Sequence, residues 1–245
     1  EHLIVSDFDD VSAEVAKESS HILFYDLHFK GSGSSHPHIS LKNSICFINC
    51  RFSGGTHGDC IKLTDDCSFI GCHFSDMSST ASSGNHLIDC SGPGHTVLYC
   101  VFDFLSDDDN KPYTCIKTGG TKTNWIFGNV FMLGDGCSAV KWSGGAAAGS
   151  LPNCMWFVGN SLYSEADPAV DSFRASTNAA KRIVYLDNLV EGFAVGLDLK
   201  SSHNVLAWGG NSAYNNTTNF DTVGDVWYEF RGGNFESADA NGNKD

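Results

Sequence analysis

The chain has 245 residues, and its 29 acidic side chains outnumber the 15 basic ones to give a formal net charge of −14. That balance argues against nucleic acid or an anionic lipid surface as the main partner, and no apolar run reaches the roughly 18 residues that a membrane-spanning helix needs. Glycine is abundant, with 26 residues, and helix-forming stretches are scarce, which predicts a turn-rich, all-β chain.

Residues 1–21 are expected to form a strand and a cap at the N-terminal end. Residues 9–20 read DDVSAEVAKESS, and this pattern predicts one short amphipathic helix. Stacked strands with an open end aggregate unless that end is blocked. We therefore expect the helix to cover the first coil of the repeat that follows.

A short strand and a bend then recur along the chain. Residues 47–52 read FINCRF and residues 69–74 read FIGCHF, and the same pattern returns every 22 to 31 residues. Apolar positions alternate within each copy, as in a strand that buries one face, and the recurrence indicates stacked coils. The position two residues after the bend is held by Phe29, Phe52, Phe74, Phe102, Phe131, Leu162, Val190 and Ala213.

A second strand precedes the first in most coils and keeps the same order along the chain. Together the two columns predict a solenoid of about eight coils over residues 22–213. Residues 214–245 are expected to form a C-terminal strand and a polar tail. The apolar column of the second strand consists of Ile39, Ile61, Ile88, Ile116, Val140, Val170 and Leu197.

The bend carries small side chains that would line up from coil to coil. Stacked amides can hydrogen-bond to the next coil as an asparagine ladder, and cysteine fills the same corner as a small hydrophobic residue. The predicted structural ladder consists of Cys50, Cys72, Cys100, Asn129, Asn160, Asn188 and Asn211.

With these rungs of the type I-x-N-C-x-F, residues 22–213 resemble the right-handed parallel β-helix proteins. That pectate-lyase-like superfamily includes bacteriophage tailspikes and polygalacturonase-type hydrolases. The resemblance implies an all-β, single-stranded, right-handed parallel β-helix, a fold that hosts unrelated functions. The hydrolase motifs are incomplete, because Gly58-Asp59-Cys60 holds one Asp where such enzymes carry an adjacent pair, and Gly-His-Gly is missing.

Two carboxylates on neighbouring coils would nonetheless suit cleavage of a glycosidic bond. Lys62, Lys117 and Lys141 share an outer face with Asp89, and a row of paired surface charges is the simpler interpretation of that face. For a polysaccharide lyase or a glycoside hydrolase acting on an extracellular glycan, the catalytic candidates are Asp59, Asp65, Asp66, Asp76 and Asp89.

None of these patterns requires a cofactor. Asp107, Asp108 and Asp109 form an acidic loop that could bind calcium, although a solvated loop tip is the simpler interpretation. The ten cysteines fall mainly on packing columns rather than on converging zinc positions, and parallel stacked side chains hold their Cβ atoms too far apart for disulfides. Free thiols suit assembly in a reducing compartment, with a virion or an extracellular surface as the final location.

One column is apolar where a strand that faces water should be polar. A sheet that is apolar on both faces is expected to be covered by another chain, which indicates self-association or contact with neighbouring subunits. The predicted interface consists of Tyr25, Ile48, Ile70, Leu98, Trp125, Phe127, Trp156, Val158 and Leu186.

The sequence therefore predicts a structural or assembly β-helix module of a virion, a fibre or a cell surface. Two alternatives stay open. One is the polysaccharide-active enzyme, and the other is a non-catalytic glycan-binding module in which Trp125 and Trp156 serve as stacking platforms for sugar rings.

Overall fold

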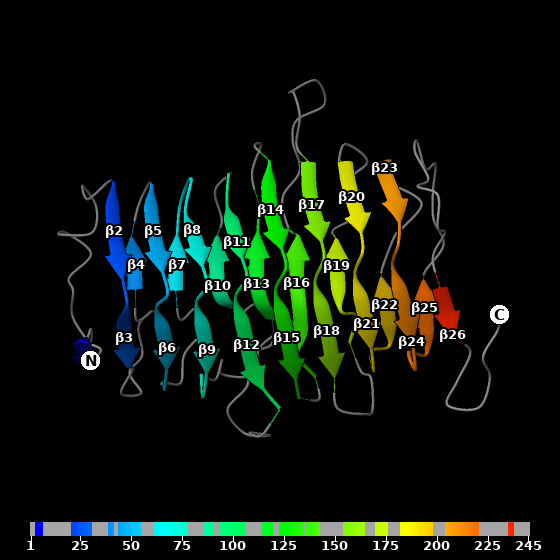
Figure 1. The fold of residues 1–245 in the computed structure, drawn as a ribbon, viewed down its shortest axis with the longest axis horizontal. Helices are drawn as coiled ribbons and strands as arrows, with labels where there is room; N and C mark the ends of the chain where they lie inside the picture. Colours follow the sequence, from blue (N-terminus) through cyan, green and yellow to red (C-terminus); the bar gives the residue numbers. More distant parts are fainter. Residues whose placement is uncertain are drawn as a thin grey trace.

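The computed structural model describes residues 3–6, 21–30, 39–41, 44–54, 61–77, 86–90, 94–105, 114–119, 123–134, 136–142, 154–164, 170–175, 182–197, 204–220 and 235–237. All regular secondary structure in these ranges is β-strand, and the paired strands run parallel. They stack along the long axis of a rod, from β1 near one end to β26 near the other (Figure 1).

Sheet I contains eight strands among the described residues. Their order in the sheet follows their order in the chain, so each strand pairs with the equivalent strand of the coils before and after it. The strands are β2 (Ile22–Tyr25), β5 (Ile45–Ile48), β8 (Ser68–Ile70), β11 (Thr96–Leu98), β14 (Asn124–Phe127), β17 (Cys154–Val158), β20 (Arg182–Leu186) and β23 (Asn204–Gly209).

Sheet II follows sheet I across a sharp corner in each coil and contains ten strands in the described ranges. They are β1 (Leu3–Ser6), β3 (Leu27–Lys30), β6 (Arg51–Ser53), β9 (His73–Ser75), β12 (Val101–Phe104), β15 (Val130–Leu133), β18 (Ser161–Ser164), β21 (Leu189–Glu191), β24 (Ser212–Tyr214) and β26 (Phe235–Ser237).

Sheet III closes the coil and has six strands in the part of the chain that the structure describes. They are β4 (Ile39–Leu41), β7 (Ile61–Leu63), β10 (His86–Cys90), β13 (Thr114–Thr118), β16 (Ser138–Trp142) and β19 (Phe173–Ala175). Beyond them, β22 (Val195–Leu197) pairs with β25 (Thr218–Phe220).

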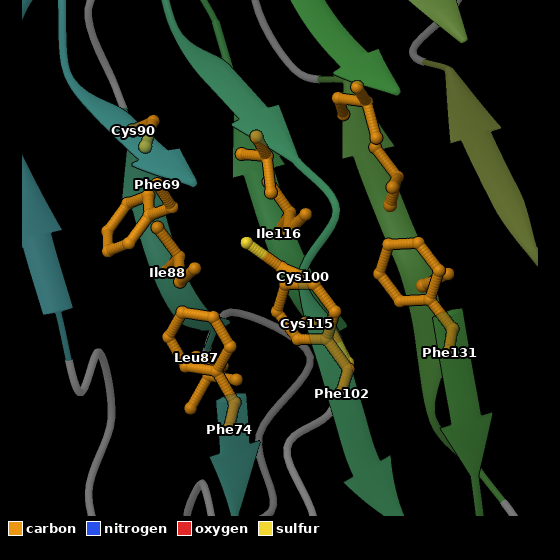
Figure 2. Packing of buried hydrophobic residues seen from close by; sticks show 14 of the residues in the cluster. Phe69, Phe74, Leu87, Ile88, Cys90, Cys100, Phe102, Cys115, Ile116 and Phe131 are labelled. Atoms are coloured by element: carbon orange, nitrogen blue, oxygen red, sulfur yellow. The ribbon is translucent and has the colours of Figure 1, made fainter. Parts of the chain in front are cut away.

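The core is built from side chains that repeat from coil to coil because the register is kept. Phe29, Phe52, Phe74, Phe102 and Phe131 pair in one column of sheet II. Neighbouring rings in this column stack with centroids 4.6 to 5.0 Å apart, and Figure 2 shows the last three on successive strands. Burial of each ring contributes roughly 1.5–3 kcal/mol, so this stacking holds successive coils in register.

The corner between sheets I and II carries a ladder of amides. Asn129 Nδ2 donates to Asn160 Oδ1 at 3.0 Å, and Asn160 Nδ2 donates to Asn188 Oδ1 at 3.1 Å. The ladder continues from Asn188 Nδ2 to Asn211 Oδ1 at 2.9 Å. Each acceptor oxygen also binds the backbone N–H of the preceding rung, as in the 3.0 Å bond from Asn160 N to Asn188 Oδ1. Every buried amide in this column is therefore tied to the next coil.

Thiols occupy the same corner on the earlier coils. Cys100 N donates to Asn129 Oδ1 at 2.9 Å, and Cys72 N donates to Cys100 Sγ at 3.4 Å. Cys72 Sγ donates in turn to the carbonyl oxygen of Phe47 at 3.4 Å. Since sulfur is a weak donor and a weak acceptor, this part of the column is held mainly by packing.

The residue before each ladder position has a left-handed backbone. Glycine, asparagine and aspartate adopt this conformation most readily, and they fill the column except at Tyr99. The column consists of Asp26, Asn49, Gly71, Tyr99, Gly128, Gly159, Asp187 and Gly210, with φ between 54° and 66°.

The structure confirms an all-β solenoid of parallel strands. Parallel pairing reaches both ends of the described chain, where β1 pairs with β3 and β26 pairs with β24. The helix predicted for residues 9–20 lies outside the described residues, and the right-handed sense, the number of coils and the domain bounds stay predictions. No helix in the described ranges is long and apolar enough to cross a membrane.

Candidate functional site

The outward side of sheet I is apolar from β2 to β17. In β14 the inward Asn124 and Ile126 are buried, whereas the outward Trp125 and Phe127 are 42% and 36% exposed. The strand register places the equivalent outward residues in two columns. We call this set the outer face, and none of its members is charged: Leu23, Tyr25, Cys46, Ile48, Ser68, Ile70, Thr96, Leu98, Trp125, Phe127, Trp156 and Val158.

Exposure falls along the outer face toward the later coils. Leu23 and Tyr25 on β2 are 60% and 63% exposed, whereas Val184, in the same column on β20, is only 2% exposed. Leu186, the last residue of the predicted interface, is half-buried on β20. The accessible part of the surface therefore runs over β2 to β17, and the other predicted interface residues all lie on it.

Four aromatic side chains gather at the middle of this surface. Trp125 and Trp156 stack on neighbouring strands, with ring centroids 4.9 Å apart and planes at 18°. Phe127 meets Tyr99 edge to face, with centroids 5.6 Å apart and planes at 85°. Tyr99 occupies the left-handed corner directly after β11 and is 60% exposed. The aromatic surface thus continues from sheet I onto the corner.

A row of charges runs along sheet III. Asp89, Lys117 and Lys141 pair in register on β10, β13 and β16, and Lys62 on β7 extends the row. Lys117 Nζ lies 3.0 Å from Asp89 Oδ2, and the Asp89 residue is only 4% exposed. Asp89 Oδ1 is buried and has no hydrogen-bond partner among the described residues. The predicted surface row thus contains a buried ion pair.

His86 begins the strand that carries Asp89, and it is 1% exposed. Burial lowers the pKa of His86 to about 4, with Lys117 and Lys141 acting in the same direction and Asp89 opposing them. The imidazole is therefore neutral at physiological pH. A neutral, buried histidine beside an ion pair contributes to structure, and its charging would oppose folding.

The other acidic candidates are spread over separate parts of the coil. Asp65 and Asp66 lie in the turn between β7 and β8, and Asp76 follows β9. Asp66 and Asp76 both have left-handed backbones, with φ of 51° and 52°, which is the geometry that turns assign to aspartate. Apart from the adjacent Asp65 and Asp66, the candidates come from different corners. Asp59 lies outside the described residues.

The calcium candidates Asp107, Asp108 and Asp109 also lie outside the described residues. Within the described ranges, no group of three or more His, Cys, Asp or Glu side chains is placed to hold a metal ion.

None of the nine described cysteines forms a disulfide. A hydrogen bond with Cys100, together with burial, raises the pKa of Cys72 to about 12, and burial raises the pKa of Cys67 to about 11. Such thiols are poor nucleophiles and poor metal ligands at neutral pH. Cys46, on the outer face, is partly exposed, whereas the other eight are buried.

No family model matches the chain, and no curated protein matches it. Among solved structures, the chain is similar to the crystal structure of the Dettilon tailspike protein, with 12% sequence identity and a TM-score of 0.32. The match covers 90% of this chain and 53% of that one, so the chain spans about half the length of the tailspike chain. At this level of similarity the fold assignment rests on the strand register alone.

Proposed function

We propose that the chain is a structural β-helix module of a virion, a fibre or a cell surface, and that it associates with further subunits through the outer face. The observation that carries the proposal is the outward side of β2 to β17, where large apolar side chains are exposed and charges are absent. A strand that faces water normally alternates apolar and polar residues. The apolar outward columns are explained if another polypeptide covers them.

The size of this surface suits a contact between subunits. Six strands about 4.8 Å apart, each with two outward side chains, form a strip of roughly 400 Å², which is near the upper limit for a monomer. Two such surfaces would bury about 800 Å² in total, which is small for a permanent interface. The surface therefore suits an assembly in which each subunit makes several contacts at once.

Charge favours the same surface. Two copies of a chain with a net charge of −14 repel each other over most approach directions. The outer face is the described surface on which no charge opposes close approach. Further copies of the chain and neighbouring subunits are accordingly the proposed partners.

Glycan binding is less well supported by the aromatic geometry. Trp125 and Trp156 are stacked at 4.9 Å, so each indole uses one ring face on the other. A sugar platform needs an exposed ring face, and the outward parts of these two rings adjoin Phe127 rather than a polar rim.

An enzyme is also less well supported. Asp89 is engaged by Lys117 at 3.0 Å, and the remaining described acids lie at separate turns, whereas glycosidic cleavage needs two carboxylates across one bond. The proposed function needs no cofactor, and calcium binding by Asp107, Asp108 and Asp109 stays a prediction. The buried thiols suit assembly in a reducing compartment before the protein reaches a virion or a cell surface.

Sedimentation over a range of protein concentrations tests this function. The wild-type mass should rise with concentration, and Phe127→Asp should stay monomeric because it places a charge within the contact. Tyr163→Asp is the matched control, since Tyr163 is an outward aromatic residue on sheet II with 40% exposure. Equal association of wild type and Phe127→Asp would contradict the proposal, as would cleavage of an acidic glycan by a monomer.

A further inference from the structure

Tyr99 is an exception within its own column. The other seven corner residues, which are Asp26, Asn49, Gly71, Gly128, Gly159, Asp187 and Gly210, are of the types that tolerate a left-handed backbone. Tyr99 has φ of 54°, and a bulky residue in this conformation is strained. Strain of this kind persists at positions with a function.

The chain's own packing does not account for the ring. Tyr99 N donates to the carbonyl oxygen of Phe127 at 3.0 Å, a bond that every residue type except proline could make. The side chain is 60% exposed, and its aromatic contact is the edge-to-face pair with Phe127. A strained position thus holds a ring that remains mostly in water.

The corner has the shape of a ridge between two notches. A Cβ atom at Gly128 would lie 2.7 Å from Cδ1 and Cε1 of Tyr99, so the ring lies over bare backbone. A Cβ atom at Gly71 would meet no atom within 4 Å, and one at Gly159 would meet only Gly128 N at 3.9 Å. Open space therefore follows on the coil before Tyr99 and on the coil after Gly128.

We infer that Tyr99 anchors the contact with a second copy of this chain, by placing its ring in the glycine notch at Gly71 or Gly159 of that copy. The inference rests on the proposed function. Each copy carries both the ridge and the notches, so one surface suffices for a closed, self-complementary contact. The corner is uncharged from Gly71 to Gly159, so two acidic copies can meet there, and buried tyrosines are frequent anchors of interfaces.

Tyr99→Asn separates this role from a structural one. Asparagine accepts the left-handed backbone, so the variant should melt at the wild-type temperature or above it, while its dissociation constant should rise about tenfold or more. A residue that only supported the fold would instead lower the melting temperature and leave association unchanged once the protein is folded.

Filling the notches tests the second half of the contact. The double variant Gly71→Asn/Gly159→Asn keeps left-handed residues at both positions and should weaken association as much as Tyr99→Asn. Gly136→Asn is the control, because Gly136 also has a left-handed backbone, with φ of 78°, and open space around its Cα, but lies before β16. It should associate like the wild type.

The outcomes separate this inference from the proposed function. If Phe127→Asp abolishes association while Tyr99→Asn or the double glycine variant associates normally, the outer face stands as an interface and the corner contact is wrong. A wild-type chain that stays monomeric overturns the second copy as partner. The proposed function then survives only if Phe127→Asp prevents incorporation of the chain into its parent assembly.

Discussion

Asn160 and Asn188 are joined twice: Asn188 Oδ1 accepts both the side-chain amide of Asn160 at 3.1 Å and its backbone N–H at 3.0 Å. Asn160 Nδ2 also donates to the carbonyl oxygen of Ile126 at 3.0 Å. Two successive coils are thus fixed to each other at one buried corner, where unmade hydrogen bonds are costly.

Asn160→Ala should lower the free energy of unfolding by about 1–3 kcal/mol, because buried partners on both neighbouring coils lose a bond. Urea denaturation measures the change. Asn160→Cys should cost less, since thiols fill the same corner at Cys72 and Cys100. An alanine variant as stable as the wild type would show that the ladder contributes little.

Acid should destabilise the protein through His86. Its pKa is lowered from 6.5 to about 4, so the unfolded chain takes up this proton at higher pH than the folded chain. Stability from this site is fully present above about pH 6.5 and is lost as the pH falls toward 4, by about 3 kcal/mol in total.

His86→Gln isolates that contribution from the carboxylates that titrate in the same range. The difference in unfolding free energy between wild type and variant, followed from pH 7 to pH 4, should shrink as the pH falls. A difference that is independent of pH would mean that His86 charges equally easily in both states.

Lys117→Met should destabilise the protein by about 3 kcal/mol, because it leaves the buried carboxylate of Asp89 without its cation. Adding Asp89→Asn should recover much of the loss, since the uncompensated charge is then removed. Lys62→Met, in the same row at an exposed position, should change stability by no more than about 0.5 kcal/mol. Thermal or urea unfolding of the four variants measures the coupling, and additive effects would contradict an ion pair that matters.

Gly128→Ala should cost about 1–2 kcal/mol, because Gly128 has φ of 65° and left-handed backbone is unfavourable for alanine. The added Cβ would also meet the Tyr99 ring at 2.7 Å. In a Tyr99→Asn background the ring contact is gone, so the cost should fall to that of the backbone alone. Equal costs in both backgrounds would place the Tyr99 ring elsewhere.

The repeat made much of the fold predictable. Because each coil must bury the same interior positions, residues such as Phe52, Phe74 and Phe102 mark the register directly in the sequence, and the structure pairs them. The outward apolar column was visible for the same reason, since alternation separates the two faces of a strand.

Two further columns were visible in the sequence but were not recognised. The Gly, Asn and Asp residues before the ladder mark the left-handed corner, and their meaning depends on backbone conformation rather than on hydropathy. The apolar column of sheet I is interrupted where Cys67 N donates to His95 Nδ1 at 3.4 Å and His95 N donates to Asn124 Oδ1 at 3.1 Å. This is a second polar ladder, which a search for apolar periodicity passes over.

The burial of Asp89 could not be read from alternation. Its outward position predicted a surface charge, yet Leu87 and Cys115, at the other outward positions of β10 and β13, are also fully buried. Cover of an outward face depends on segments far away in the sequence, about which strand periodicity is silent.

Reaction of Cys46 with a maleimide tests the central claim most directly, since Cys46 is the partly exposed thiol of the outer face. In a Cys60→Ser background, with the modified residue identified by peptide mass, its rate should fall as the wild-type concentration rises and stay constant in Phe127→Asp. The same rate at every concentration in both proteins would contradict an outer face covered by a second copy.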